Sequence, residues 1–147
     1  MLLTILAGDR QQHQVSCVLS SSVRTEAKQM MQTNPFTSLV GESISAVAFV
    51  MDYVEFHFNG PRLRALTNPV VHTAAIDIQF PNSGSRDALC SLIGQAVENV
   101  RLKETQFLEL IFASGVSLVI PLGAQDLGGP EALHWHPDDD LRNMMIW

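Results

Sequence analysis

The chain has 147 residues, of which 46% are hydrophobic and 16% are charged, and its formal net charge is −6. This length can bury a core without disulfides or metals and predicts one main domain, while the acidic charge and the absence of a lysine or arginine cluster argue against nucleic acid as the ligand. Because few charges accompany so much apolar sequence, part of the apolar surface is expected to be covered in an oligomer.

The N-terminal stretch, MLLTILAGDR, lacks a basic region, and its apolar run is too short for a signal peptide or a membrane span. We therefore expect a soluble, cytoplasmic protein that does not contact membranes. Residues 1–20 alternate as a hairpin would, and residues 20–32 have a serine cap followed by a helical pattern that Asn34-Pro35 ends. Residues 1–38 are therefore predicted to be an N-terminal extension, and residues 39–147 a single domain.

This domain is organised around an internal repeat of residues 39–66 and 92–122. Aligning Gly94 with Gly41, an offset of 94 − 41 = 53, brings apolar residues and glycines into register, and the extra residues fall in turns. Each copy carries three short apolar or alternating segments, the pattern of three antiparallel strands. The predicted strands are residues 43–50, 53–58 and 63–67 in the first copy, and residues 96–103, 107–112 and 116–122 in the second.

A fourth strand and a helix are predicted between the two copies. Residues 74–80 alternate, and the serine-rich loop after them can cap a helix that runs to about Ile93. Cys90 lies in that helix and is expected to be buried, since the two cysteines have neither metal nor redox spacing. Residues 132–136 and 144–147 are predicted to be short edge strands.

These elements predict an α+β domain. The two repeated three-stranded antiparallel units, related by a pseudo-twofold axis, are expected to form a bent sheet or half-barrel, with a helix between them and a second helix near the N-terminus. No long crossover helices recur between the strands, which argues against a doubly wound α/β fold.

Polar side chains share one face of the first copy. Tyr53, Glu55 and His57 alternate along one strand, and Arg62 and Arg64 project to the same face from the next. Such a face can bind a ligand with an acid–base pair and an aromatic wall, for which Tyr53, Glu55, His57 and Arg64 are the candidates. The alternative is a solvated surface, which is what opposed charges on paired strands usually form.

The corresponding face of the second copy is apolar. Glu109 takes the place of Glu55, but Ile111 replaces His57 and Val119 replaces Arg64. We therefore expect both glutamates to be structural and the apolar side chains to need a cover. Together with the apolar end of the chain, they predict a homo-oligomer, expected to be a dimer. The predicted interface residues are Phe107, Ile111, Val119, Met145 and Trp147.

His134 and His136 flank a tryptophan and can bring two imidazoles to one face of a strand, with Asp138 as a third metal ligand. Two histidines without a firm third ligand do not define a metal site, and the alternative is an exposed strand whose tryptophan is buried. The chain has no P-loop, dinucleotide fingerprint, nucleophile elbow or calcium loop, so neither a cofactor nor a catalytic residue is predicted.

A series of short motifs follows in order along the chain: Gly41-x-x-Ile44-x-x-Val47, Asp52-Tyr53-Val54-x-Phe56-x-Phe58, the leucine-rich Leu89–Gly94, Leu108-x-Leu110-x-Phe112-x-x-Gly115, Leu118-x-Ile120-Pro121, Gly129-Pro130-Glu131 and Trp147. In these motifs the chain, from about Leu39 onwards, resembles a family of small bacterial proteins catalogued only as a domain of unknown function. The motif positions are core and turn residues, so the resemblance implies the fold and no catalytic residue.

We therefore expect a protein that works by association rather than an enzyme. It is predicted to be a homo-oligomer or a partner-binding module of an immunity or adaptor kind. The alternative is a small-molecule-binding protein or an enzyme that uses the polar face of the first copy, with Tyr53, Glu55, His57 and Arg64.

Overall fold

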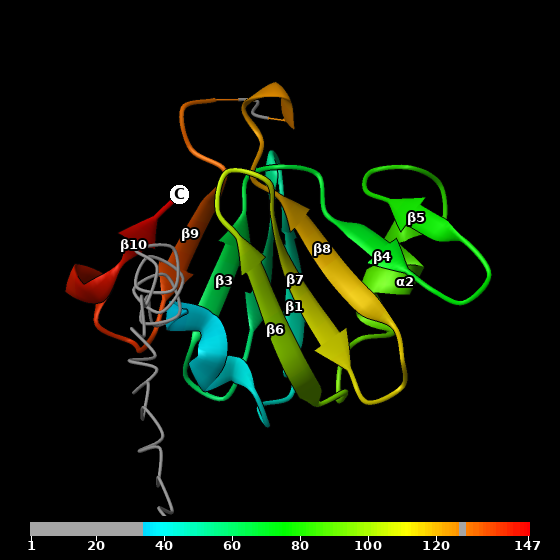
Figure 1. Cartoon of the computed structure of the whole chain (residues 1–147), viewed down its shortest axis with the longest axis horizontal. Coiled ribbons are helices and arrows are strands. Elements are labelled where there is room, and N and C mark those ends of the chain that lie inside the picture. The colour runs from blue at the N-terminus through cyan, green and yellow to red at the C-terminus, as the bar shows by residue number, and fades with distance from the viewer. Residues whose placement is uncertain (1–33, 127–128) are drawn as a thin grey trace, which may run out of the picture. The chain divides into compact units, whose positions relative to one another are not determined.

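Antiparallel strands make up most of the regular structure in the computed structural model, which describes residues 34–126 and 129–147 (Figure 1). The predicted N-terminal hairpin and helix lie within residues 1–33, outside the described residues. Sheet 1 consists, in spatial order, of β1 (Ala46–Val50), β2 (Tyr53–His57), β3 (Arg62–Ala65), β9 (Leu133–His136) and β10 (Met145–Ile146). Sheet 2 consists of β5 (Asp77–Gln79), β4 (Val70–His72), β8 (Ser117–Pro121), β7 (Phe107–Phe112) and β6 (Val97–Lys103).

Short helical segments lie at the borders of these sheets. The α-helix α2 (Ser85–Cys90) contacts β1, β4 and β5, and the 3-10 helix η1 (Pro35–Leu39) contacts β6. Two further 3-10 turns, η2 (Ala124–Asp126) and η3 (Leu141–Asn143), belong to the loops before β9 and β10. The described part of the chain is therefore α+β, as predicted, with α2 between the two groups of three strands in the sequence.

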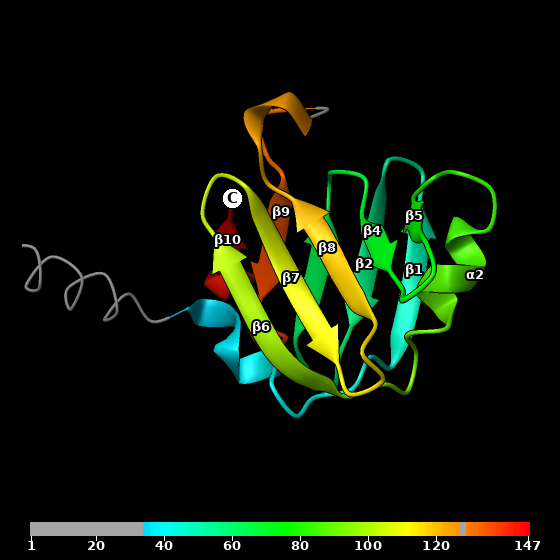
Figure 2. The same cartoon turned by 45° about the vertical axis from the view of Figure 1, so that its right-hand side comes forward.

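The alternation of side chains along each strand decides which of them enter the core. Val54 and Phe56 of β2 are fully buried, and so are Leu108 and Leu110 of β7 on the facing sheet. Figures 1 and 2 show sheet 2 lying in front of sheet 1, and buried side chains from both sheets form one apolar cluster. Residues 54, 56 and 58 face inward, so the face that Tyr53, Glu55 and His57 were predicted to share is the outer face of the sheet.

The 3-10 helix η1 packs the start of the described chain against sheet 1. Asn34 caps it by accepting a hydrogen bond from the backbone N–H of Phe36 at 3.0 Å, and Pro35 occupies the first helical position. The ring centroid of Phe36 lies 5.4 Å from that of Trp135 and 4.8 Å from that of Trp147. These aromatic contacts join three segments that are far apart in the sequence.

The two segments that lead into β1 and β6 pair with each other. Gly41 donates its backbone N–H to Val97 at 2.8 Å, and Gly94 donates to Ile44 at 2.7 Å. Both glycines have a positive φ, 90° for Gly41 and 84° for Gly94, a conformation that glycine adopts at little cost. This pairing links the two sheets at one end.

Several predicted elements require correction. The strands form two separate sheets instead of a single bent one, and β9 lies between β3 and β10 instead of at an edge. Of the strand predicted for residues 74–80, only β5 forms, and it pairs with β4, which was not predicted. The Thr73 hydroxyl donates to the backbone carbonyl of Ile76 at 2.8 Å and closes the turn between them. Cys90 is exposed, because α2 ends there and turns its last residue to solvent.

Candidate functional site

Strand register gathers the polar side chains on the outer face of sheet 1. Glu55 pairs with Arg64, and Arg64 pairs with His134, so these residues share one face across three strands. One step along the strands, Arg62 pairs with both His57 and His136. We call this surface the polar face; it consists of Tyr53, Glu55 and His57 from β2, Arg62 and Arg64 from β3, and His134 and His136 from β9.

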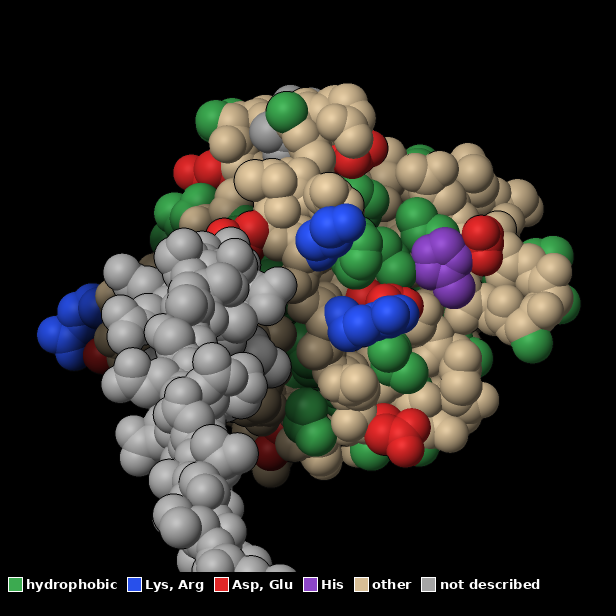
Figure 3. All heavy atoms as spheres, viewed as in Figure 1, with side chains coloured by type: hydrophobic (Ala, Val, Ile, Leu, Met, Phe, Trp, Pro, Cys, Tyr) green, Lys and Arg blue, Asp and Glu red, His purple; other side chains and the backbone are tan. Residues whose placement is uncertain are grey.

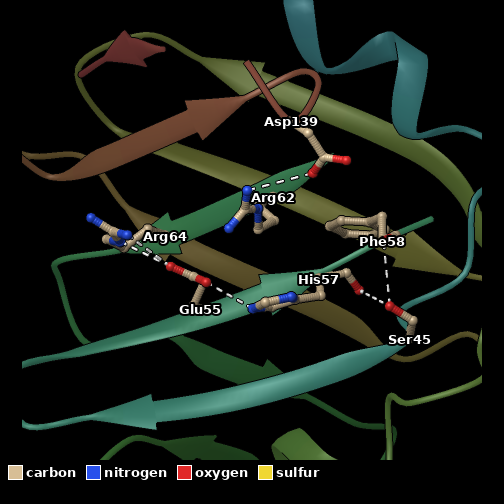
Figure 4. A network of polar contacts seen from close by, with 7 residues as sticks. All are labelled: Ser45, Glu55, His57, Phe58, Arg62, Arg64 and Asp139. Atoms are coloured by element: carbon tan, nitrogen blue, oxygen red, sulfur yellow. Dashed lines mark hydrogen bonds and ion pairs between the residues drawn. The ribbon is translucent and has the colours of Figure 1, made fainter. Parts of the chain in front are cut away.

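Glu55 lies at the centre of the polar face and is buried there by its neighbours (Figure 4). Its Oε2 atom accepts a hydrogen bond from Nε of Arg64 at 3.0 Å, and its Oε1 atom lies 2.7 Å from Nε2 of His57. Burial alone would raise the pKa of Glu55, but the hydrogen bond and charge of Arg64, aided by His57, hold this pKa below its usual value. Glu55 is therefore an ionised anchor that orients a guanidinium and an imidazole.

Tyr53 supports the same arginine from the side. The guanidinium carbon of Arg64 lies 4.7 Å from the centroid of the Tyr53 ring, within the range of a cation–π contact. The geometry therefore brings together the four predicted ligand-binding residues, Tyr53, Glu55, His57 and Arg64. A general acid at neutral pH needs a raised pKa, and Glu55 has the opposite shift, so its position favours binding over proton donation.

His134 and His136, which were considered as metal ligands, lie on the polar face beside the arginines. His134 contacts Glu131 through Nε2, whereas Asp138 accepts hydrogen bonds from the backbone of Asp140 and the side chain of Asn143, both at 2.9 Å. Among residues 34–126 and 129–147, no group of three or more His, Cys, Asp or Glu side chains is close enough to hold a metal ion. The nearest charged groups on β3 are cations, which oppose a metal at this place.

His136 is the least satisfied side chain of the polar face. Only 4% of its surface is exposed, and neither ring nitrogen has a hydrogen-bond partner in the described structure. Burial lowers the pKa of His136 below 6.5, and the charges of Arg64 and Arg62 and of His134 act in the same direction, whereas Glu55 opposes them. The folded chain therefore holds this imidazole neutral.

The neutral state of His136 predicts a pH dependence of stability. The unfolded chain takes up a proton at this residue below its ordinary pKa of 6.5, and the folded chain does so only at lower pH. The free energy of unfolding should therefore decrease as the pH falls below that value, by no more than about 1.4 kcal/mol per pH unit for one proton. The variants His136→Gln and His136→Phe should both lose this part of the slope in urea denaturation from neutral to mildly acidic pH. An unchanged slope in both variants would contradict the assignment.

A cavity adjoins the polar face. Its volume is about 270 Å³, and it is lined by Asp52, Leu66, Gly129, Pro130 and Glu131. Glu131 is the residue that contacts His134, and Leu66 follows β3 directly. The cavity therefore lies where the polar face meets the β1–β2 turn.

The predicted interface residues fall in two places. Phe107, Ile111 and Val119 are half-buried on the outer face of sheet 2, where hydrophobic side chains alternate with charged ones (Figure 3). In the same face, Arg101 pairs with Glu109 at 2.6 Å. The other predicted interface residues belong to the C-terminal segment: Met145 is exposed on β10, whereas Trp147 packs on Phe36.

Sequence reasoning found the polar residues of β2 and β3 but did not join His134 and His136 to them. The alternation of residues 134 and 136 was a usable signal, since it places both imidazoles on one face. What the sequence lacked was the partner strand, because β3 and β9 are separated by 67 residues, from position 66 to position 132.

Comparisons of the chain with protein-family models, with curated proteins and with solved structures found no match. Within the part of the chain that the structure describes, no helix combines the length and apolar character needed to cross a membrane. The function is therefore inferred from the geometry of the polar face and from the exposed surface.

Proposed function

We propose that the protein acts by association and that its C-terminal strand β10 joins two copies of the chain. A single observation carries this proposal: three consecutive large hydrophobic side chains are exposed on one sheet edge, Met144 by 38%, Met145 by 43% and Ile146 by 49%. Burying a methionine or isoleucine completely contributes about 1.5 to 3 kcal/mol, so these half-exposed side chains can stabilise a dimer measurably.

The other sheet edges support the choice of β10. In the described residues, α2 contacts β1, η1 contacts β6, and β5 carries exposed polar side chains, Asp77 and Gln79. Proteins commonly block sheet edges with such covers or polar residues. Among the described residues, β10 has neither kind of protection, and its only strand neighbour there is β9. Two β10 strands can pair antiparallel about a twofold axis, which presents the same surface from each copy.

Introducing a charge on β10 should therefore weaken the dimer. We expect Ile146→Lys to shift sedimentation velocity profiles from dimer to monomer at micromolar concentration, because the lysines of both copies would meet at the axis. The matched control is Ile76→Lys, which places the same charge at an exposed isoleucine in the β4–β5 turn. A wild-type chain that stays monomeric up to high micromolar concentration would refute the dimer. A monomer is also what we expect if the β10 edge binds an extended segment of another protein, as the edge of an adaptor or immunity module would.

The polar face supports a second candidate function, the binding of a small molecule. The observation that favours it is the cavity beside a face on which Glu55 holds Arg64 and His57 in fixed positions. Pre-oriented polar groups next to a cavity are typical of ligand sites. A screen of small neutral and charged fragments by NMR tests it, and a face whose resonances respond to none of them would exclude it.

The remaining expectations from the sequence are proposals of the same kind. Membership of a family of small bacterial proteins rests on the motif residues. Duplication of a three-stranded unit is supported by Gly41 and Gly94, which are aligned in the repeat and share a positive φ.

A further inference from the structure

The unpaired imidazole of His136 calls for an explanation. Buried polar groups in folded proteins nearly always have hydrogen-bond partners, and an unpaired one costs about 1 to 3 kcal/mol. His136 has two such atoms, since neither Nδ1 nor Nε2 has a partner among residues 34–126 and 129–147, and within the same residues Nδ1 of His134 is buried without a partner as well. A neutral imidazole always carries one N–H group that needs an acceptor.

The side chains around His136 offer donors in excess. Arg62 pairs with His136 in the strand register, and Arg64 lies two residues further along β3, on the same face. Guanidinium groups donate hydrogen bonds and accept none. The nearby acceptor Glu55 is already engaged by Arg64 and His57. Apart from the exposed Asp139, the described residues offer this part of the polar face no further acceptor oxygens.

Arg62 shows which kind of group can fill that place. Its Nη2 atom has one anionic contact in the described structure, to Asp139 at 3.5 Å, and the Asp139 side chain is 86% exposed (Figure 4). An ion pair this long and this exposed contributes little. The carboxylate of Asp139 can thus be displaced by a better-placed oxyanion at little cost.

We propose that Arg62, Arg64 and His136 form a binding site for the oxyanion group of a small molecule, a carboxylate or a phosphate. Arg62 and His136 donate to the oxygens, while Glu55 holds Arg64 so that its remaining N–H groups add positive charge beside them. This inference rests on the second candidate function, small-molecule binding by the polar face, and it names the chemical group that is recognised.

The test is a titration of the full chain, labelled with ¹⁵N in the histidine rings, with inorganic phosphate and with acetate in separate experiments at constant ionic strength. We expect a saturable shift of the His136 ring signals with at least one of these anions. Phosphate alone identifies a phosphate ligand and acetate alone a carboxylate ligand. In Arg62→Gln the affinity should fall roughly tenfold or more, which is the contribution of one hydrogen bond to a charged group.

The matched control is Arg101→Gln, which removes an arginine from the outer face of sheet 2 and should leave the affinity unchanged. Circular dichroism and thermal unfolding verify that each variant is folded, and Arg62→Lys, which keeps the charge, should retain part of the affinity. Equal affinities in Arg62→Gln and Arg101→Gln would overturn the proposal, as would the absence of a saturable response to either anion. If neutral fragments still shift the polar face in that case, only the oxyanion inference fails; if they do not, small-molecule binding fails with it.

Discussion

Replacing Trp135 with alanine is expected to destabilise the protein by about 3 to 5 kcal/mol, the usual cost of removing a large buried aromatic side chain. Trp135 is fully buried, and its ring packs against Phe36, which anchors η1. The cavity left by the substitution would therefore loosen both sheet 1 and the start of the described chain. Urea denaturation followed by circular dichroism measures the loss, with Trp147 as a second, fluorescent reporter.

A matched variant separates the volume of Trp135 from its chemistry. The indole N–H of Trp135 is buried and has no hydrogen-bond partner in the described part of the chain, so Trp135→Phe removes an unsatisfied donor together with part of the ring. Trp135→Phe should cost less than about 2 kcal/mol. It leaves a smaller cavity than alanine does, and the removal of the unsatisfied N–H offsets part of the remaining cost. If Trp135→Ala costs no more than Trp135→Phe, the packing of η1 on sheet 1 is not as the structure shows it.

The second large effect is expected at Glu55. Glu55→Gln should cost about 2 kcal/mol at neutral pH, less than the roughly 3 to 5 kcal/mol for breaking a fully buried pair, because Arg64 and His57 stay about one-third exposed. The matched variant is Glu109→Gln on sheet 2, where Glu109 pairs with an arginine that is 61% exposed. That substitution should cost less than about 1 kcal/mol, since exposed partners are screened by water.

The effect of Glu55→Gln should also depend on pH. The pKa of Glu55 is lowered in the folded protein, so its stabilising contribution is fully present above the ordinary value of 4.5 and is lost as the pH falls through the folded pKa. The stability curves of the wild type and of Glu55→Gln should therefore converge in acid. Stability curves that stay parallel below pH 4.5 would show that Glu55 is not an ionised anchor. Equal losses of stability in Glu55→Gln and Glu109→Gln would show the same.

The strands that follow a strict alternation could be predicted from the sequence. β2 and β7 were found within one residue of their observed ends, because Val54, Phe56, Leu108 and Leu110 face the core while their neighbours face outward. The β4–β5 hairpin was missed because its turn contains Ile76, an exposed isoleucine that continues the apolar pattern. Local patterns locate strands well when one face is buried and badly when a turn carries apolar residues.

The residues that β2 and β3 contribute to the candidate site could be predicted from the sequence, but the contribution of β9 could not. Tyr53, Glu55, His57 and Arg64 lie on neighbouring strands joined by a short turn, so their contacts follow from local register. His136 reaches the same face only because β9 pairs with β3. The sequence pattern of β9 is equally compatible with other strand orders, so it does not predict this pairing. The burial of the His136 ring depends on that pairing and therefore had no local signal.

The position of β9 and β10 also affects the order in which the protein can fold during synthesis. All five strands of sheet 2 lie before residue 122, whereas sheet 1 needs residues 133–146 to receive its last two strands. A nascent chain therefore exposes the free edge of β3, with its arginines and apolar residues, until those residues have left the ribosome. During this interval the unpaired edge of β3 can pair with another chain. Aggregation during synthesis is therefore expected to begin at β3 rather than at sheet 2.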